Sequence, residues 1–135
     1  MRGRAGSGDM ATILLVEDDP LQASVRKSIL ERKFPDVRRV SDAAEALCLV
    51  EQPEFARNLC LVVTGHHLSG IGGPAFVAEL HTRIPSLPVL VVDDSSEKHS
   101  DYPGDSIRFL SRPFRAEELL TLARQMLLQD QQKTA

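Results

Sequence analysis

Residues 12–20 read TILLVEDDP. The first five form a continuous, largely apolar run, which is typical of a parallel strand that is buried on both faces. Three acidic residues follow this run. Pro20 then favours the start of a helix, because its missing N–H is not needed in the first helical turn. A buried strand, an acidic turn and a helix are therefore predicted in direct succession.

The same alternation of short strands and helical patterns continues to the end of the chain. Further strands are predicted over residues 37–40, 59–63, 89–92 and 107–110. Helices are predicted from Pro20 to Phe34, from the Ser41-Asp42 cap to Pro53, from Pro74 through Leu80, and from Ala116 to Leu128. The first helix is expected to bury Leu21, Val25 and Ile29. This spacing predicts an α/β fold: a doubly wound, five-stranded parallel sheet with helices on both faces.

The composition narrows the class of protein. With 135 residues, 42% hydrophobic and 26% charged, the chain is expected to form one globular domain. A formal net charge of −3 argues against sequence-independent binding to nucleic acid. No apolar stretch reaches the roughly 20 residues of a membrane span, and no signal-peptide pattern follows the N-terminus. We expect a cytoplasmic protein.

Three segments are expected along the chain. Residues 1–10 are rich in Gly, Ser and Arg, and are interpreted as a disordered arm, an expression remnant or a stretch ahead of a second start at Met10. Residues 11–128 carry the domain, and residues 129–135 form a polar tail that is expected to fray. Cys48 and Cys60 lie in apolar runs without metal-ligand spacing, so they are interpreted as buried free thiols.

Function is expected at one edge of the predicted sheet. Parallel sheets of this kind bind ligands at the carboxyl ends of their strands. The residues at those ends are Glu17, Asp18, Asp19, Gly65, His66, His67, Asp93, Asp94, Ser111, Arg112, Pro113 and Phe114.

Four motifs at these positions, in order and at matching spacing, resemble the response regulator receiver (CheY-like) family of bacterial two-component signalling. They are ILLVEDDP at residues 13–20, SDAAEAL at 41–47, LSGIGG at 68–73 and SRPF at 111–114. The likeness spans residues 11–128. It implies a flavodoxin-like receiver fold, and a signalling protein in a phosphorelay rather than an enzyme.

The resemblance places a glycine where the family carries its phosphoacceptor aspartate. Counting five residues back from Gly70, or eight from Gly73, leads to Gly65 by both routes. A glycine has no side chain that can accept a phosphoryl group. The sequence therefore predicts a degenerate receiver, or pseudo-receiver, with no catalytic residue at this position. A plainer interpretation is that Gly65 is a turn residue with positive φ.

Other family positions are changed as well. Glu17 and Asp18 match the acidic pair that holds a divalent cation in the family, so magnesium is the one cofactor to consider, although we expect none. Asp93 stands where the family has a hydroxyl residue, and a carboxylate there repels a phosphoryl group. Arg112 replaces the family's lysine and is expected to pair with Asp93, and the bond from Arg112 to Pro113 is expected to be cis as in the family.

The connection between the last two strands also departs from the family. Residues 95–106 contain a single large apolar residue, Tyr102, and a Pro-Gly turn signal. The fourth helix of a receiver is therefore predicted to be short or missing. The loss of this helix is expected to expose Leu119 on the last helix and Phe109 on the fifth strand. Phe109 is also counted among the degenerate active-site positions.

Three functions remain open. The first is a stand-alone, phosphorylation-independent interaction module that binds a histidine kinase, another regulator or an output protein, with a homodimer through the fifth strand and last helix as one form. The second is a sensor that binds a metal or an anion in the strand-end cleft. The third is a phosphotransfer receiver with a different acceptor. The cleft residues of the second are Glu17, Asp18, His66, Asp93 and Arg112, and the acceptors of the third are Asp18, Asp19 and Asp93.

Plainer interpretations accompany these functions. Asp18 and Asp19 suit the positive end of a helix dipole whether or not they bind a ligand. His66 and His67 are interpreted as an exposed pair rather than a metal site. Arg112 is interpreted as a structural ion-pair partner.

Overall fold

The computed structural model describes residues 11–68, 70–93, 102 and 106–134. These form a single five-stranded sheet in which every strand pair is parallel, in the order β2-β1-β3-β4-β5. The strands are β1 (Thr12–Val16), β2 (Asp36–Val40), β3 (Leu59–Gly65), β4 (Val89–Asp93) and β5 (Ile107–Ser111). The predicted flavodoxin-like α/β fold is confirmed. The chain reverses its direction across the sheet between β1 and β3, which is where such folds place their ligand sites.

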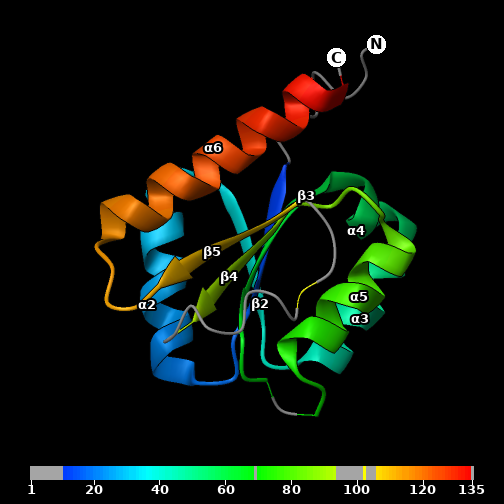
Figure 1. The fold of residues 1–135 in the computed structure, drawn as a ribbon, viewed down its shortest axis with the longest axis horizontal. Coiled ribbons are helices and arrows are strands. Elements are labelled where there is room, and N and C mark those ends of the chain that lie inside the picture. Colours follow the sequence, from blue (N-terminus) through cyan, green and yellow to red (C-terminus); the bar gives the residue numbers. More distant parts are fainter. Residues whose placement is uncertain (1–10, 69, 94–101, 103–105, 135) are drawn as a thin grey trace.

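Helices cover both faces of this sheet. They are α2 (Pro20–Leu30), α3 (Ala43–Val50), α4 (Pro53–Asn58), α5 (Gly73–Arg83) and α6 (Ala116–Thr134). Helices α2 and α6 lie on one face, and α3, α4 and α5 lie on the other (Figure 1). Among the described residues, no helix is long and apolar enough to cross a membrane.

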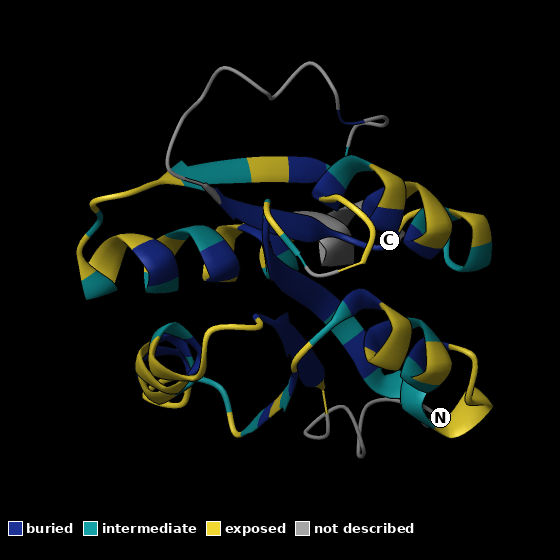
Figure 2. Cartoon of the chain, turned by 90° about the horizontal axis from the view of Figure 1, so that it is seen from below, coloured by how far each residue is buried: buried dark blue, intermediate teal, exposed yellow. Residues whose placement is uncertain are grey.

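The two faces of the sheet carry separate apolar cores. All five residues of β1 are buried, and the side chains of its four apolar residues alternate between the two cores. Leu14 and Val16 pack with Phe76 of α5, whereas Ile13 and Leu15 pack with Leu119 of α6. Figure 2 shows the buried strands between helices whose outer surfaces are exposed. This two-sided burial explains why β1 is a continuous apolar run.

Helix α2 differs from its prediction. Leu21 is 70% exposed and Val25 48% exposed, so the predicted inward stripe is wrong at both positions. The buried face instead contains Ala23, Arg26, Ile29 and Leu30. These residues follow helical spacing equally well, and the helix is rotated so that Arg26 faces inward. The helix ends at Leu30, short of Phe34, and closes in hydrogen-bonded turns.

Two helix boundaries also differ. Pro53 does not merely end α3, which stops at Val50; it starts the separate helix α4, where proline is tolerated in the first turn. The predicted cap of α3 is confirmed, because Asp42 Oδ1 accepts a hydrogen bond of 2.8 Å from the Glu45 N–H. Helix α6 continues past Leu128 to Thr134, since the Gln and Lys residues of this stretch are good helix formers.

The two cysteines are less buried than predicted. Both are free thiols, but Cys48 is exposed and Cys60 is partly buried. Cys48 lies on the outer surface of the amphipathic helix α3, whose inner face is made by Ala43, Ala46 and Val50. Cys48 stands in an apolar run, but its side of the helix faces solvent, so the run alone does not predict burial at this position.

The predicted loss of the fourth receiver helix lies outside the described residues, apart from Tyr102. Tyr102 is buried, and its ring packs edge-to-face on Phe109 with centroids 5.3 Å apart. Phe109 is partly buried, and Leu119 is fully buried in the core under α6. The expected exposure of Leu119 is therefore wrong, because α6 turns this side chain onto the sheet.

Candidate functional site

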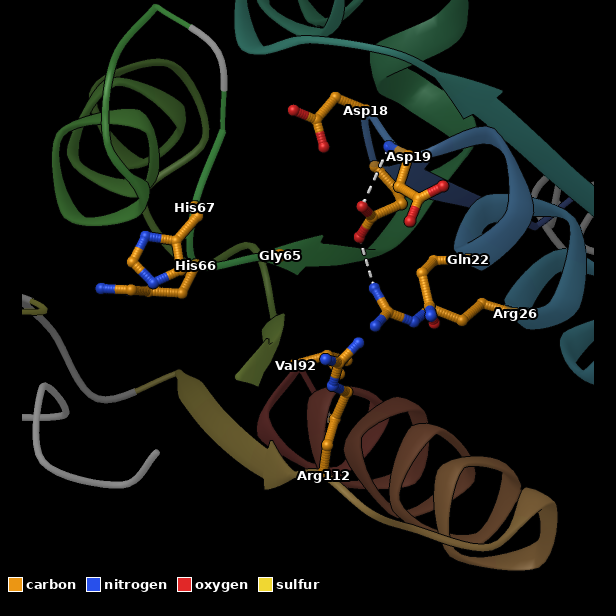
Figure 3. A pocket seen from close by; sticks show the side chains of 10 residues that line it. Asp18, Asp19, Gln22, Arg26, Gly65, His66, His67, Val92 and Arg112 are labelled. Atoms are coloured by element: carbon orange, nitrogen blue, oxygen red, sulfur yellow. Dashed lines mark hydrogen bonds and ion pairs between the residues drawn. The ribbon is translucent and has the colours of Figure 1, made fainter. Parts of the chain in front are cut away.

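A polar pocket of about 200 Å³ opens at the carboxyl edge of the sheet, around the point where the strand order reverses. Strands β1, β3, β4 and β5 and helix α2 contribute to it (Figure 3). Its lining residues are Glu17, Asp18, Asp19, Gln22, Arg26, Gly65, His66, His67, Val92 and Arg112. The structure thus brings together most of the strand-end residues that the sequence singled out.

Glu17 follows β1 and is only 8% exposed. Its Oε1 forms an ion pair with Arg26 Nη1, and its Oε2 accepts a hydrogen bond of 3.1 Å from the Asp19 N–H. Its main-chain carbonyl accepts two further bonds from Arg39, at 3.1 Å from Nε and 2.7 Å from Nη2. Both carboxylate oxygens of Glu17 are therefore engaged by the protein itself.

Arg26 is the main residue that the sequence reasoning missed. It is only 4% exposed, although arginine is seldom buried without a partner. Burial lowers its pKa, the charge of Glu17 raises it, and the positive charge of Arg112 lowers it further. Its Nε lies buried with no hydrogen-bond partner among the described residues. The available signal was its spacing, three residues after Ala23 and three before Ile29, on the face that α2 buries.

The two aspartates after Glu17 have different roles. Asp19 is the N-cap of α2, and its Oδ1 accepts a hydrogen bond of 3.0 Å from the Leu21 N–H. Asp18 is exposed, and Figure 3 shows its carboxylate directed away from Arg26. Asp19 thus lies at the start of α2, where the helix-dipole interpretation placed it, and it also caps the helix, which was not predicted from the sequence.

Gly65 ends β3, in register with Val92 of β4. Its φ is not positive; among the described glycines only Gly70 has this conformation, with φ 94°. The interpretation of Gly65 as a turn residue is therefore wrong. A Cβ atom added at Gly65 lies 3.2 Å from Glu17 Oε1, which is a tight contact. Position 65 thus adjoins the buried acid directly, and glycine leaves that side of the pocket without a side chain.

His66 and His67 stand beside Gly65 with their rings edge-to-face, 4.7 Å between centroids. His66 Nδ1 is hydrogen-bonded to the Tyr102 hydroxyl at 2.6 Å. No group of three or more His, Cys, Asp or Glu side chains able to hold a metal occurs in the described part of the chain. His66 therefore helps to anchor Tyr102 to the edge of the pocket.

Arg112 reaches the pocket from the loop after β5. The peptide bond between Arg112 and Pro113 is cis, as expected. Figure 3 shows its guanidinium approaching that of Arg26. The side chain of Asp93, its expected partner, lies outside the described residues, so that pairing stays a prediction.

The pocket residues do not fit a divalent cation. Magnesium requires near-octahedral oxygen ligands, usually one or two carboxylates among them. Here the Glu17 carboxylate is engaged by Arg26 and by a backbone N–H, and Gly65 offers no side-chain oxygen. Asp18 and Asp19 are exposed, but Asp19 caps α2, and two guanidinium groups lie in the same pocket. The Glu17 charge that a metal would neutralise is already neutralised by Arg26.

The parallel sheet in this strand order, with an acidic pocket where the order reverses, defines a flavodoxin-like receiver fold. The profile of the response regulator receiver domain family matches residues 13–124, so the chain belongs to this family. Receiver domains are signalling modules of two-component systems and interact with proteins such as histidine kinases and output domains. A comparison with curated proteins finds no match.

Solved structures agree with this assignment. The signal receiver domain of an HD domain-containing protein from Pseudomonas fluorescens Pf-5 is 26% identical with a TM-score of 0.78, over 90% of this chain and 97% of that one. The receiver domain of NtrX from Brucella abortus is 25% identical with a TM-score of 0.72, over 85% and 97%. A CheY-like receiver domain protein from Methanospirillum hungatei JF-1 is 21% identical, with a TM-score of 0.76 over 92% and 98%.

Proposed function

We propose that this receiver domain acts in two-component signalling as a protein-interaction module that does not depend on phosphorylation, and that it is not an enzyme. The observation that carries the proposal is Gly65, at the end of β3 beside Glu17. This is the position that the family's motif spacing assigns to the phosphoacceptor. Without a carboxylate there, the pocket lacks the nucleophile of the phosphoryl-transfer step.

The neighbouring acids are poor replacements. Glu17 is buried and paired with Arg26, and Asp19 caps α2. Asp18 is exposed, but it extends from the end of β1 rather than β3. A phosphotransfer receiver with a different acceptor is therefore the weaker alternative.

A sensor of metal ions or anions is the other alternative. The Glu17 carboxylate disfavours a metal, because it is already paired with Arg26 and hydrogen-bonded to the Asp19 N–H. For an anion, Arg26 and Arg112 supply positive charge, but Glu17, Asp18 and Asp19 line the same small pocket. Three carboxylates against two guanidinium groups leave little attraction for a negatively charged ligand.

Partner binding requires accessible surface outside the pocket. Among the described residues, the most exposed large apolar side chain is Leu21 on α2, and Val25 follows one turn later. Val25 lines a surface hollow of about 550 Å³, together with Gln22, Ile29, Arg112, Pro113 and Phe114. On the alternative face, Leu128 of α6 is 51% exposed, whereas Leu119 is buried. We propose that a protein partner contacts the α2 side, and that a homodimer through β5 and α6 is the alternative.

A phosphodonor assay tests the function. The protein is incubated with acetyl phosphate and magnesium, and its intact mass is measured by mass spectrometry, with an active receiver as the positive control. We expect no stoichiometric gain of one phosphoryl group, and unchanged affinity for a partner captured by pull-down. A hydroxylamine-labile adduct on Asp18, Asp19 or Asp93 overturns the proposal.

A further inference from the structure

The charge balance of the pocket rests on one internal pair. Glu17 is almost fully buried, and a buried carboxylate requires a countercharge and hydrogen bonds to remain ionised. Arg26 supplies the charge at Oε1, and the Asp19 N–H supplies a hydrogen bond at Oε2. The countercharge that a bound cation would supply to Glu17 therefore comes from the chain itself.

The source of this countercharge is permanent. Arg26 belongs to the buried face of α2, between Ala23 and Ile29, which pack towards the sheet. Its side chain therefore reaches Glu17 from inside the domain rather than from solvent. A diffusible ion leaves when its concentration falls, whereas a guanidinium on a packed helix stays within reach of its partner.

The same guanidinium repels a second cation. Arg112 adds another positive charge in the pocket, and its effect on Arg26 is to lower the pKa of that group. A divalent ion at the Glu17 carboxylate is repelled at close range by the Arg26 guanidinium that already pairs with it, so its entry is unfavourable. Asp18 and Asp19 are both exposed, but Asp19 caps α2, and position 65 offers no side-chain oxygen to complete a ligand set with Asp18.

We propose that Arg26 is a tethered cation that takes the place of a divalent metal at Glu17, so that the pocket is metal-independent and excludes magnesium and manganese. This inference deepens the proposed function and rests on it in part, because a receiver that needs no phosphoryl group also needs no metal to assemble one. It assigns to Arg26 a positioning role: it holds the Glu17 carboxylate in a single arrangement.

A stable fold does not require the Glu17–Arg26 ion pair, provided that both charges are removed together. Arg26 Nε is buried without a hydrogen-bond partner among the described residues, which costs free energy. Replacing both members of a buried ion pair with neutral groups of similar volume is often neutral or stabilising, whereas removing one member is strongly destabilising. The double variant E17Q/R26M is therefore expected to fold close to the wild-type stability.

The test compares the response of thermal unfolding to magnesium and manganese chloride. Sodium chloride at equal ionic strength is the control salt. Wild-type protein is expected to show no metal-specific shift in Tm and no binding heat in calorimetry. R26M leaves Glu17 buried and unpaired, so its Tm is expected to fall by roughly 10–15 °C. The divalent ion is then expected to restore several degrees of this loss, since it binds the freed carboxylate of the folded state.

Two variants serve as matched controls. E17Q/R26M lacks the carboxylate and is expected to show no metal response. K27M removes the neighbouring cation of α2, whose ion pair with Glu31 is exposed, and is expected to change Tm by no more than about 2 °C. If R26M is unfolded without metal, refolding on addition of magnesium supports the proposal. Failure to refold, while E17Q/R26M folds, contradicts it.

Two further results contradict the proposal that Arg26 replaces a metal. Saturable binding of magnesium or manganese to the wild-type pocket, seen as shifts of amide signals around Glu17 in NMR spectra, overturns the inference. So does an R26M protein that is as stable as wild type and indifferent to metal. These results are separate from the phosphodonor assay: metal binding without phosphorylation refutes the tethered cation alone, and phosphorylation without metal binding to the unmodified protein refutes the proposed function alone.

Discussion

Gly65 and Glu17 share a space that admits only one side chain without adjustment. A Cβ atom at position 65 lies 3.2 Å from Glu17 Oε1, so any larger residue displaces that carboxylate by a few tenths of an ångström or more. Because Arg26 holds the other side of the same oxygen, the displacement also disturbs the ion pair. If position 65 is the phosphoacceptor position, as we propose, an aspartate placed there therefore does not simply repair the site.

G65D is expected to destabilise the domain by roughly 1–3 kcal/mol through crowding and like-charge repulsion, and not to restore phosphorylation. Urea unfolding measures the first effect, and intact mass after acetyl phosphate treatment measures the second. G65A introduces the Cβ alone, and is expected to cost less than G65D. Stoichiometric phosphorylation of G65D with Arg26 in place contradicts this prediction.

Gly73 is the second position where a missing Cβ matters. A Cβ atom added there lies far inside van der Waals contact with the Tyr102 hydroxyl oxygen, and 2.9 Å from the His66 carbonyl oxygen. The Tyr102 hydroxyl is in turn hydrogen-bonded to His66 Nδ1 at 2.6 Å. Gly73 therefore makes room for the Tyr102 hydroxyl beside His66.

G73A is expected to destabilise the domain by roughly 1–3 kcal/mol, because the added methyl group forces Tyr102 out of its site. G72A is the matched control: its Cβ meets only Pro74 Cδ, at 3.8 Å, so it is expected to change stability by less than about 0.5 kcal/mol. Both are measured by urea unfolding. Adding Y102F to G73A is expected to recover part of the loss, and equal costs for G73A and G72A argue against the contact.

Helix α2 is the element in which sequence pattern and structure differ most. Leu21 and Val25 have the spacing of an inward stripe, but Ala23, Arg26 and Leu30 make the buried face. Both sets satisfy helical periodicity, so the pattern alone does not set the rotation of the helix about its axis. The rotation brings Arg26 to Glu17 and leaves apolar side chains facing solvent.

Substitutions on α2 separate stability from partner binding. V25K is expected to change the free energy of unfolding by no more than about 0.5 kcal/mol, and to weaken binding of a protein partner through the α2 surface. L30A removes a fully buried side chain of the same helix, and is expected to cost roughly 2–5 kcal/mol. Chemical denaturation and a pull-down with purified partner measure the two effects.

The matched variant for partner binding is L128K, on the exposed end of α6. It is expected to leave the α2-directed partner bound. If V25K has no effect and L128K abolishes self-association in analytical ultracentrifugation, the homodimer through β5 and α6 replaces the α2 surface as the interface.

At the scale of the whole molecule, the fold follows from the order of elements. Alternating strand and helix patterns predict a parallel sheet with helices on both faces, and all five predicted strands are present. The apolar run of β1 indicates burial on both faces, which two separate cores provide. Local patterns suffice for these features because periodicity and turn residues act within a few positions of the chain.

The pocket depends on contacts that are distant in the sequence. The position of Gly65 is readable from motif spacing, and so are the acids after β1. The burial of Arg26 against Glu17, the bond between His66 and Tyr102 and the exposure of Val25 are not. Each depends on how a helix or loop is rotated when it packs on the sheet. Side-chain pattern limits that rotation to a few alternatives, and tertiary packing selects the one that buries Ile29 and Leu30 and pairs the Glu17 carboxylate with Arg26, although Leu21 and Val25 then face solvent.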